Sequence, residues 1–235
     1  MRSGYLTALC VCLCLLLAAC GGDDYHYPSV RMEFLTATAG ADGALKLVLA
    51  DDGAVCPVWE DRSHTRLEAG EKVRMVSNYE TVFNAAGEAG VRLYAVMKAI
   101  APQPKPAAEF EEGIHTAPAS VQSIWMGYDY LNILLSVSQP GKHQLHFIEE
   151  EVGELQPDGT LAVKLMLYHA VQEEATDYEK RAYLSVPLRQ YVTEGVRRVN
   201  VQFSLHSDQA FDEPYEKPDS QVGGVMTYNF EYIPK

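Results

Sequence analysis

Long apolar runs are scarce in this chain of 235 residues. Only positions 6–19 form one, and it consists almost entirely of Leu, Ala, Val and Cys. A helix that crosses a bilayer needs roughly 20 apolar residues, so this run is too short for one and has the length of the apolar region of an export signal. Because no second run of that length follows, we expect no transmembrane helix in the exported protein.

A cysteine closes this apolar run in the setting of a bacterial lipoprotein signal. Ala18 and Ala19 are small enough for the pocket of a signal peptidase, and the thiol of Cys20 can accept a diacylglycerol. We therefore predict a lipoprotein signal peptide at residues 1–19, acylation of Cys20 with palmitate among its acyl chains, and a glycine-rich tether at residues 20–28. Buried acyl chains contribute about 0.8 kcal/mol per methylene and would hold the protein on a membrane. The alternative is an ordinary secretory signal in which Cys20 has no role.

Cysteine pairs are also lacking once the signal is set aside. Three of the five cysteines lie within the signal and Cys20 is acylated, which leaves Cys56 alone. One thiol cannot form an internal disulfide bond, so the fold must depend on its apolar core. We expect Cys56, beside Pro57 in an apolar stretch, to be a buried and unreactive thiol.

Positive charge is in short supply, with 19 Lys and Arg against 32 Asp and Glu and a formal net charge of −13. Such a chain repels phosphate backbones, which excludes nucleic acid as a partner. The partner classes that remain are a membrane, reached through the N-terminal lipid, and an envelope protein or glycan.

Motifs that announce catalysis or metal binding are missing as well. The chain has no His-Glu-x-x-His, no Cys-x-x-Cys and no Gly-x-Ser-x-Gly motif. The closest histidine pair, His143 and His146, is three apart on an expected strand, so the two rings should point to opposite faces and share no metal ion. Glu149–Glu151 and Glu154 lead into Pro157-Asp158-Gly159, which favours a solvated hairpin loop over a glycosidase site. We therefore predict no catalytic residue, no metal site and no cofactor.

A long loop is expected between His206 and Gly224. It carries five acidic residues: Asp208, Asp212, Glu213, Glu216 and Asp219. Long loops in compact domains are often functional, and carboxylate oxygens suit calcium, but the spacing lacks the ligand alternation of an EF-hand loop. A solvated loop is the favoured interpretation, and calcium binding stays open as the alternative.

What the chain has in abundance is apolar and polar residues alternating with period two, which is typical of half-buried β-strands. Five such stretches precede residue 101, beginning at Val30, Leu45, Ala54, Val73 and Val91. Five short strands in a segment of this size predict an OB-like five-stranded β-barrel at residues 29–101. Prolines crowd residues 102–118, which we expect to form a linker.

Seven further stretches of the same kind follow the linker. They begin at Val121, Leu131, His143, Leu161, Leu184, Val199 and Met226. Seven antiparallel strands most simply pack as two sheets, and no long amphipathic helix competes with them. We therefore predict a seven-stranded antiparallel β-sandwich at residues 119–235 and an all-β fold for the whole protein.

Three motifs stand in a fixed order along this plan. Leu49-Ala50-Asp51-Asp52-Gly53 and Gly70-Glu71-Lys72-Val73-Arg74 belong to the first domain, and Ser123-Ile124-Trp125-Met126-Gly127-Tyr128-Asp129-Tyr130-Leu131-Asn132 opens the second. With the lipoprotein signal and the proline-bearing linker, this order resembles the NigD-like lipoproteins of Gram-negative gut and oral bacteria over nearly the whole exported chain. The resemblance implies an N-terminal OB-like domain and a C-terminal β-sandwich, and it implies no catalytic residue.

Tyrosine and tryptophan are the remaining candidates for ligand contact, because their rings stack on sugars and anchor protein interfaces. Trp59, Tyr128 and Tyr215 fall at expected strand ends or in loops, and we take them as candidate ligand contacts. Trp125 enters an expected strand and is assigned to the core. Core packing is the alternative for the other three as well.

These observations favour a lipid-anchored envelope protein that binds another protein or a glycan without catalysis. A hydrolase acting on a polysaccharide or peptide is one alternative. An assembly or immunity factor is another, because the NigD name comes from a bacteriocin-associated gene cluster. Asp23 and Asp24 resemble the acidic tags that route lipoproteins of these bacteria to the outer face of the outer membrane, although Gly21 and Gly22 intervene. We therefore expect an outer-membrane lipoprotein, on the cell surface or on the periplasmic face.

Overall fold

The computed structural model describes residues 29–139, 142–172, 178–207 and 217–235, and Arg31–Lys235 form one compact unit. Nearly all regular structure in these segments is β-strand, joined by two short 3-10 helices. No helix in the described segments is both long and apolar enough to cross a membrane. The predicted signal peptide and tether lie outside the described residues.

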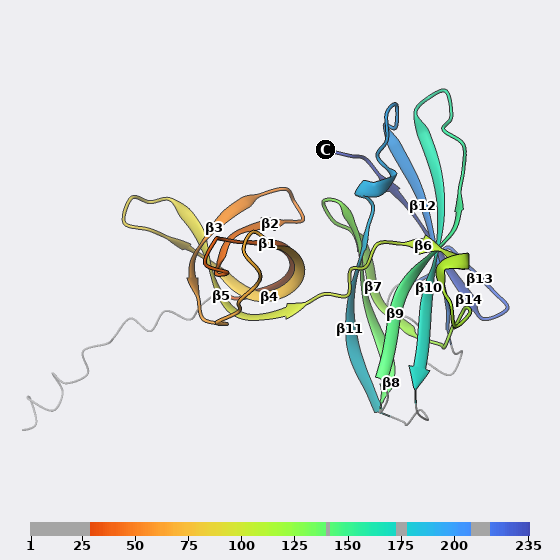
Figure 1. The fold of residues 1–235 in the computed structure, drawn as a ribbon, viewed down its shortest axis with the longest axis horizontal. Helices are drawn as coiled ribbons and strands as arrows, with labels where there is room; N and C mark the ends of the chain where they lie inside the picture. The colour runs from red at the N-terminus through yellow and green to blue at the C-terminus, as the bar shows by residue number, and fades with distance from the viewer. Residues whose placement is uncertain (1–28, 140–141, 173–177, 208–216) are drawn as a thin grey trace, which may run out of the picture. The chain divides into compact units, whose positions relative to one another are not determined.

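The first five strands close into a barrel (Figure 1). They are β1 (Arg31–Ala39), β2 (Leu45–Ala50), β3 (Val55–Asp61), β4 (Lys72–Phe83) and β5 (Ala89–Lys98). Their hydrogen-bonded order is β1-β2-β3-β5-β4, and β1 also pairs with β4 to close the ring. The β3–β5 pair is parallel and the other four pairs are antiparallel. The OB-like five-stranded barrel predicted from the alternating pattern is confirmed.

The barrel is filled by the inward-facing residues of that pattern. Leu35, Val48, Met75 and Leu93 come from four different strands and are almost completely buried. Each such side chain contributes about 1.5–3 kcal/mol on burial. The same period that makes these segments strands therefore also closes the sheet around a common core.

A two-sheet sandwich follows the barrel in sequence (Figure 1). One sheet has the order β11-β8-β7 and consists of β7 (Ser120–Met126), β8 (Tyr130–Gln139) and β11 (Tyr178–Pro187). The other has the order β13-β14-β12-β10-β9-β6. Its strands are β6 (Lys105–Pro106), β9 (Lys142–Val152), β10 (Thr160–Gln172), β12 (Arg198–His206), β13 (Ser220–Val222) and β14 (Val225–Tyr232). The seven predicted strands are confirmed as a β-sandwich, with β6 and β13 as short additions that the alternating pattern does not mark.

Part of the proline-rich stretch expected as a linker lies along the sandwich. β6 pairs with Ile148 and Glu149 of β9, and the 3-10 helix η1 (Ala107–Glu109) follows it directly. Thr116 forms a bridge with His169 of β10. Pro106 lacks an N–H and is tolerated because β6 is the outermost strand of its sheet.

One pair in the larger sheet departs from the expected antiparallel arrangement. β10 and β12 run parallel, with Leu161 opposite Val199 and Leu165 opposite Phe203. Between them the chain passes through β11 in the other sheet and then returns, so both strands cross the sandwich in the same direction. Alternation in the sequence shows which face of a strand is buried, but it does not show which strand lies beside it.

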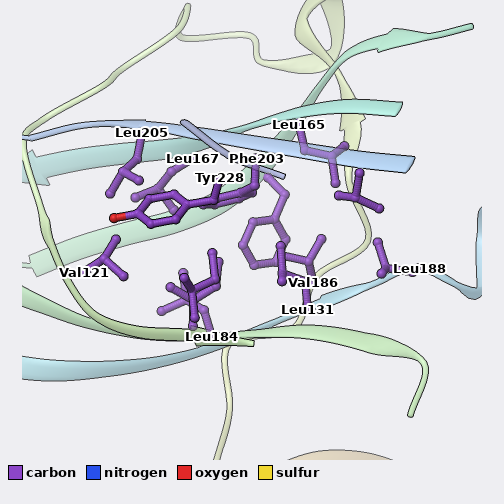
Figure 2. Packing of buried hydrophobic residues seen from close by; sticks show 14 of the residues in the cluster. Val121, Leu131, Leu165, Leu167, Leu184, Val186, Leu188, Phe203, Leu205 and Tyr228 are labelled. Carbon is purple, nitrogen blue, oxygen red and sulfur yellow. The ribbon is translucent and has the colours of Figure 1, made fainter. Parts of the chain in front are cut away.

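The two sheets meet over an apolar core (Figure 2). Leu165 and Phe203 of the larger sheet face Leu131, Leu184 and Val186 of the smaller sheet, and all five are fully buried. The sandwich holds the larger of the two apolar clusters, so it supplies most of the apolar burial that stabilises the protein.

The acidic stretch predicted as a solvated hairpin loop lies mostly on a strand. Glu149–Glu151 belong to β9, where Glu149 accepts a hydrogen bond from the Tyr191 hydroxyl at 2.8 Å and Glu151 pairs with Lys164 of β10 at 2.6 Å. These contacts extend β9 beyond the segment in which apolar and polar residues alternate. The prediction is therefore wrong for these three glutamates, and Glu154 lies beyond the end of the strand.

Candidate functional site

A buried arginine connects the three motifs that carry the family resemblance. Arg74, on β4, is only 6% exposed. Its guanidinium donates hydrogen bonds to Asp51 Oδ1 at 2.6 Å, to Asn132 Oδ1 at 2.9 Å and to Ser185 Oγ at 3.1 Å. The guanidinium carbon also lies 4.3 Å from the centre of the Tyr130 ring. Residues that are far apart in the sequence thus converge on one buried positive charge.

Burial sets the electrostatics of this cluster. Desolvation lowers the pKa of Arg74, and the carboxylate of Asp51 counteracts this by favouring the charged form. Asn132 completes the arrangement by donating to Asp51 Oδ2 at 2.6 Å. A Cβ at Gly127 would lie 2.6 Å from Asp51 Cγ and 2.7 Å from Asn132 Nδ2, so only glycine fits beside the pair. The cluster is a satisfied ion pair that fixes the surrounding loops, and its polar atoms are already in use.

An apolar cavity of about 510 Å³ adjoins this cluster, with Asp51 belonging to both. β1 and β4 of the barrel supply much of its wall, and Trp125, Leu134 and Tyr183 from the three-stranded sheet of the sandwich complete it. Ligand sites in proteins are typically concave and apolar, with a few placed polar groups. This cavity is therefore the candidate functional site.

Among the polar side chains of the cavity lining, three contact one another: Arg31, Glu33 and Tyr79. The Tyr79 hydroxyl donates to Glu33 Oε2 at 2.5 Å, and the guanidinium carbon of Arg31 lies 5.9 Å from the centre of the Tyr79 ring. Burial, together with the hydrogen bond to Glu33, raises the pKa of Tyr79 above its ordinary value, which favours the protonated hydroxyl that donates to Glu33. That hydroxyl holds Glu33 in place, and Arg31 and Glu33 offer opposite charges to the polar part of a ligand.

Large apolar side chains remain exposed at the edge of this cavity. Met32 is 52% exposed and Trp125 is 37% exposed, and both belong to the lining. Trp125 packs edge-on against Phe34, with 5.5 Å between ring centres. Exposed apolar side chains that adjoin a cavity are a feature of ligand and protein binding sites. The exposed apolar edge and the apolar interior of the cavity therefore both favour an apolar group as the occupant.

Sequence reasoning misplaces two of the lining residues. It assigns Trp125 to the core, but its neighbour Ile124 takes the inward face of β7, and the alternation of the strand turns Trp125 to the other side. It also expects Cys56 to be buried, whereas Cys56 is a half-buried free thiol in the cavity lining. The position of Trp125 beside Ile124 was a signal that could have placed it correctly. No feature of the sequence marked Glu33 or Tyr79 as a lining residue of the cavity.

Two of the aromatic residues predicted as ligand contacts do not line this cavity. Trp59 is 45% exposed, and its indole lies against Gly90, where a Cβ would come within 2.1 Å of the ring nitrogen. Tyr128 packs over Gly53, where a Cβ would lie 3.0 Å from its ring. Both residues stay predictions as ligand contacts, at places outside the cavity.

Other predicted features lie outside the described residues. They include Cys20, Tyr215 and the stretch 208–216 of the long acidic loop. Of the acidic residues in that loop, Asp219 is described. Its carboxylate accepts one hydrogen bond from the backbone N–H of Asn229 at 2.6 Å and another from the side-chain amide of Asn229 at 3.2 Å. Calcium binding by the loop stays a prediction.

The two histidines considered for metal binding, His143 and His146, contact different residues. His143 Nδ1 lies 2.8 Å from His169 Nε2, whereas the His146 ring lies edge-on to Phe110 with 5.4 Å between ring centres. Across the described segments, no group of three or more His, Cys, Asp or Glu side chains is placed to hold a metal ion.

Comparison with known proteins places this fold in a family. The model of the NigD-like C-terminal beta sandwich domain matches residues 101–216. A NigD-like immunity protein from Bacteroides caccae is 30% identical in sequence, with a TM-score of 0.68, and the match covers 90% of this chain and 100% of that one. This chain belongs to the NigD-like family. The resemblance drawn from the three motifs is thereby confirmed, and in this NigD-like protein those motifs meet at Arg74.

More distant structures share the NigD-like architecture. A protein of unknown function from Bacteroides vulgatus is 19% identical, with a TM-score of 0.59 and coverage of 87% of this chain and 91% of that one. A candidate lipoprotein from Bacteroides fragilis is 10% identical, with a TM-score of 0.55 and coverage of 88% and 99%. At these identities the likeness concerns the fold alone. No curated protein matches the chain.

Proposed function

We propose that this NigD-like protein is a non-catalytic binding module of the bacterial envelope, and that its apolar cavity receives an apolar side chain of a partner protein. The observation that carries the proposal is the cavity of about 510 Å³ with Met32 and Trp125 exposed at its edge. A partner side chain would be desolvated inside, while Arg31 and Glu33 would contact polar groups beside it.

The lining of the cavity favours a protein over a glycan as its occupant. Sugars need polar groups around their hydroxyls and an aromatic face for stacking, whereas much of this wall is aliphatic, with Val48, Val76 and Leu134 among its residues. The Trp125 ring already packs on Phe34. Burial of one large apolar side chain contributes about 1.5–3 kcal/mol, which makes it an effective anchor.

The carboxylates at the cavity support binding rather than hydrolysis. Glu33 accepts a hydrogen bond from Tyr79, Asp51 is paired with Arg74, and Asp52 accepts a hydrogen bond from the backbone N–H of Ala54. A glycosidase needs two carboxyl groups on either side of one bond, one of which delivers a proton. Because donors hold all three carboxylates, we favour affinity without turnover and place the hydrolase alternative second.

We further propose that the protein is an outer-membrane lipoprotein anchored through acylated Cys20. The small residues before Cys20 and the aspartates after it support this placement. Protease treatment of intact cells distinguishes the two faces of the membrane. Digestion places the protein on the cell surface, and protection places it on the periplasmic face.

Site-specific photo-crosslinking in living cells tests the cavity. We expect benzoylphenylalanine at Met32 to crosslink to one envelope protein, and the same group at Val222, which is 76% exposed on β13, to give no such product. Leu134→Trp narrows the cavity and should abolish the crosslink at Met32 while circular dichroism stays unchanged. A crosslink that survives Leu134→Trp, or no crosslink at all, would contradict the proposal.

Cys56 provides an independent measurement of occupancy. In a Cys20→Ala form of residues 20–235, Cys56 is the single thiol, and it lines the cavity. We expect the crosslinked partner, once purified, to slow alkylation of Cys56 in proportion to the fraction bound. A partner that binds without slowing alkylation would occupy a different surface.

A second candidate function is that of an immunity or assembly factor. The relative from Bacteroides caccae, a NigD-like immunity protein, favours it. This function predicts that deletion of the gene makes the cells more sensitive to a bacteriocin or impairs its export. Unchanged sensitivity and unchanged export in the deletion strain would count against it.

A further inference from the structure

The lining of the apolar cavity beside β1 and β4 has a buried part and a charged part. Leu35, Val48 and Val91 belong to the lining and are almost completely buried. The charged side chains of the lining are one arginine and three carboxylates: Arg31, Glu33, Asp51 and Asp52. All four are half-buried or exposed. An occupant can therefore place an apolar group against the buried residues and a charged group beside the others.

Strand register explains why two of these carboxylates reach the same cavity. β1 pairs antiparallel with β2, with Leu35 opposite Ala50. Two residues further along this register, Glu33 of β1 comes toward Asp52, which lies in the turn after β2. Both residues belong to the cavity lining. The fold of the barrel therefore brings two negative charges to the cavity from separate parts of the chain.

The three carboxylates differ in whether a cation neutralises them. Asp51 forms an ion pair with Arg74 at 2.6 Å. Glu33, by contrast, accepts a hydrogen bond from a neutral tyrosine hydroxyl, and Asp52 accepts one from a backbone N–H at 2.8 Å. Within the described ranges of the chain, neither of these two forms an ion pair. The charges of Glu33 and Asp52 therefore remain to be balanced by a ligand.

The positive charges near the cavity do not outweigh these two carboxylates. Arg31 is the single cationic side chain of the described lining, and it is exposed. Its guanidinium carbon lies 5.9 Å from the centre of a tyrosine ring of the lining. Lys235 lies outside the lining, 5.3 Å from the centre of another tyrosine ring. Water and salt screen the exposed Arg31 more than the half-buried Glu33, so the lining favours a positively charged group.

Aromatic rings in the lining suit a cation as well. There are four of them: Phe34, Tyr79, Trp125 and Tyr183. The face of an aromatic ring attracts a positive charge within about 6 Å of its centre. Arg31 lies over Tyr79 in this way, and Arg74 lies 5.5 Å from the centre of the ring beside Trp125. The aromatic part of the wall therefore favours the same sign of charge as the carboxylates.

We infer that the partner segment received by the cavity carries a basic residue next to its apolar anchor. The apolar side chain packs against the buried part of the lining, and the neighbouring ammonium or guanidinium group pairs with Glu33, with Asp52 as the second carboxylate. The net charge of −13 also steers a basic segment toward the protein. This inference rests on the proposed function and adds to it the charge that selects the partner, with Glu33 as the specificity-determining residue.

Three acetylated and amidated tetrapeptides test the sign of this charge. They are Gly-Phe-Leu-Lys and the same peptide with Gln or Glu in place of Lys. The protein is the Cys20→Ala form of residues 20–235, in which the alkylation rate of Cys56 reports occupancy of the cavity and calorimetry gives the affinity. We expect the Lys peptide to slow alkylation and to bind at least about tenfold more tightly than the Gln peptide. The Glu peptide should bind more weakly than both.

Variants of the two carboxylates identify the source of the preference. Glu33→Gln should reduce the preference for Lys over Gln to within about threefold, because Tyr79 can still donate to the amide oxygen while the charge is gone. Asp52→Asn should reduce it by a smaller factor. Glu150→Gln removes an exposed carboxylate of β9 outside the cavity lining, so it is the matched control and should leave the preference unchanged. Circular dichroism checks that each variant folds.

The outcomes separate this inference from the proposed function. If the three peptides slow alkylation of Cys56 equally, the cavity accepts apolar groups of any charge, which overturns the inference and leaves the proposed function standing. Tighter binding of the Glu peptide also overturns it, as does a preference for Lys that survives Glu33→Gln combined with Asp52→Asn. If no peptide slows alkylation, the inference and the proposed function both fail.

Discussion

Arg74 carries a positive charge into a position where only 3% of its side chain is exposed. The cost of burying an ion is offset here by the Asp51 carboxylate and by neutral acceptors on Asn132 and Ser185. These partners come from the turn after β2 and from strands β8 and β11. At the scale of single residues, this one side chain therefore links the barrel sheet to both long strands of the smaller sandwich sheet.

We expect Arg74→Ala to lower the free energy of unfolding by about 3–5 kcal/mol, because it leaves Asp51 partly buried without its cation. Urea denaturation followed by circular dichroism measures this change. Lys46→Ala, which removes an exposed ion pair with Asp42, is the control and should leave the midpoint unchanged. Equal effects of the two substitutions would show that the buried pair does not stabilise the fold.

The sequence shows these residues in recognisable motifs. It does not show that they contact one another in the folded chain. Asp51 is 23 positions and Asn132 is 58 positions from Arg74. The resemblance to the NigD-like family identified all three motifs, and only the folded chain shows that they satisfy one charge. The same limit applies to the cavity, where Glu33 and Tyr79 are joined across 46 positions.

At the scale of elements, β9 and β10 carry a pair of stacked histidines. The rings of His143 and His169 lie 5.1 Å apart at 27°, with Nδ1 of the first 2.8 Å from Nε2 of the second. One ring must donate and the other accept, so the pair requires at least one neutral ring. Burial, followed by the positive charge that His143 can carry, lowers the pKa of His169, and the backbone carbonyl of Ala117 opposes this shift.

We expect the protein to lose stability as the pH falls below the ordinary histidine pKa of 6.5. The folded pKa of His169 is depressed, so the unfolded chain binds more protons in this range and is favoured on acidification. Melting temperatures at pH 7.5 and 5.5 measure the effect, and His169→Gln should reduce the difference. His146, whose pKa burial also lowers, should retain part of it. An identical difference in the variant would exclude His169 as a source.

Strands were the most predictable elements, because alternation reports burial directly. All five barrel strands and all seven main sandwich strands follow from it. β6 and β13 are too short to alternate, and β9 extends into Glu149–Glu151 because of contacts with Tyr191 and Lys164. The parallel pairing of β10 with β12 depends on the passage of the chain through β11. These features depend on tertiary neighbours, which a local pattern does not encode.

At the scale of the whole molecule, the proposed lipid anchor would hold the apolar cavity close to one membrane. The lipid would thereby raise the local concentration of the cavity near envelope proteins.

We expect Cys20→Ala to abolish palmitate labelling and to release the protein from the membrane fraction. Only the thiol of Cys20 is proposed to carry lipid, so its loss removes the proposed anchor. Metabolic labelling and cell fractionation measure the two effects, with unchanged circular dichroism as the control for folding. Retained labelling in the variant would overturn the assignment of Cys20.

Local patterns in the sequence were enough to predict the all-β class, the barrel and sandwich strands, and an export signal that ends at Ala19, directly before Cys20. Each of these is encoded locally, by period-two alternation or by a short motif. The folded chain was needed to show that Trp125 faces a cavity and that Asp51 and Asn132 share Arg74. The physical reason is that sites form where strands from different sheets meet, and strand order and register are set by contacts between distant residues.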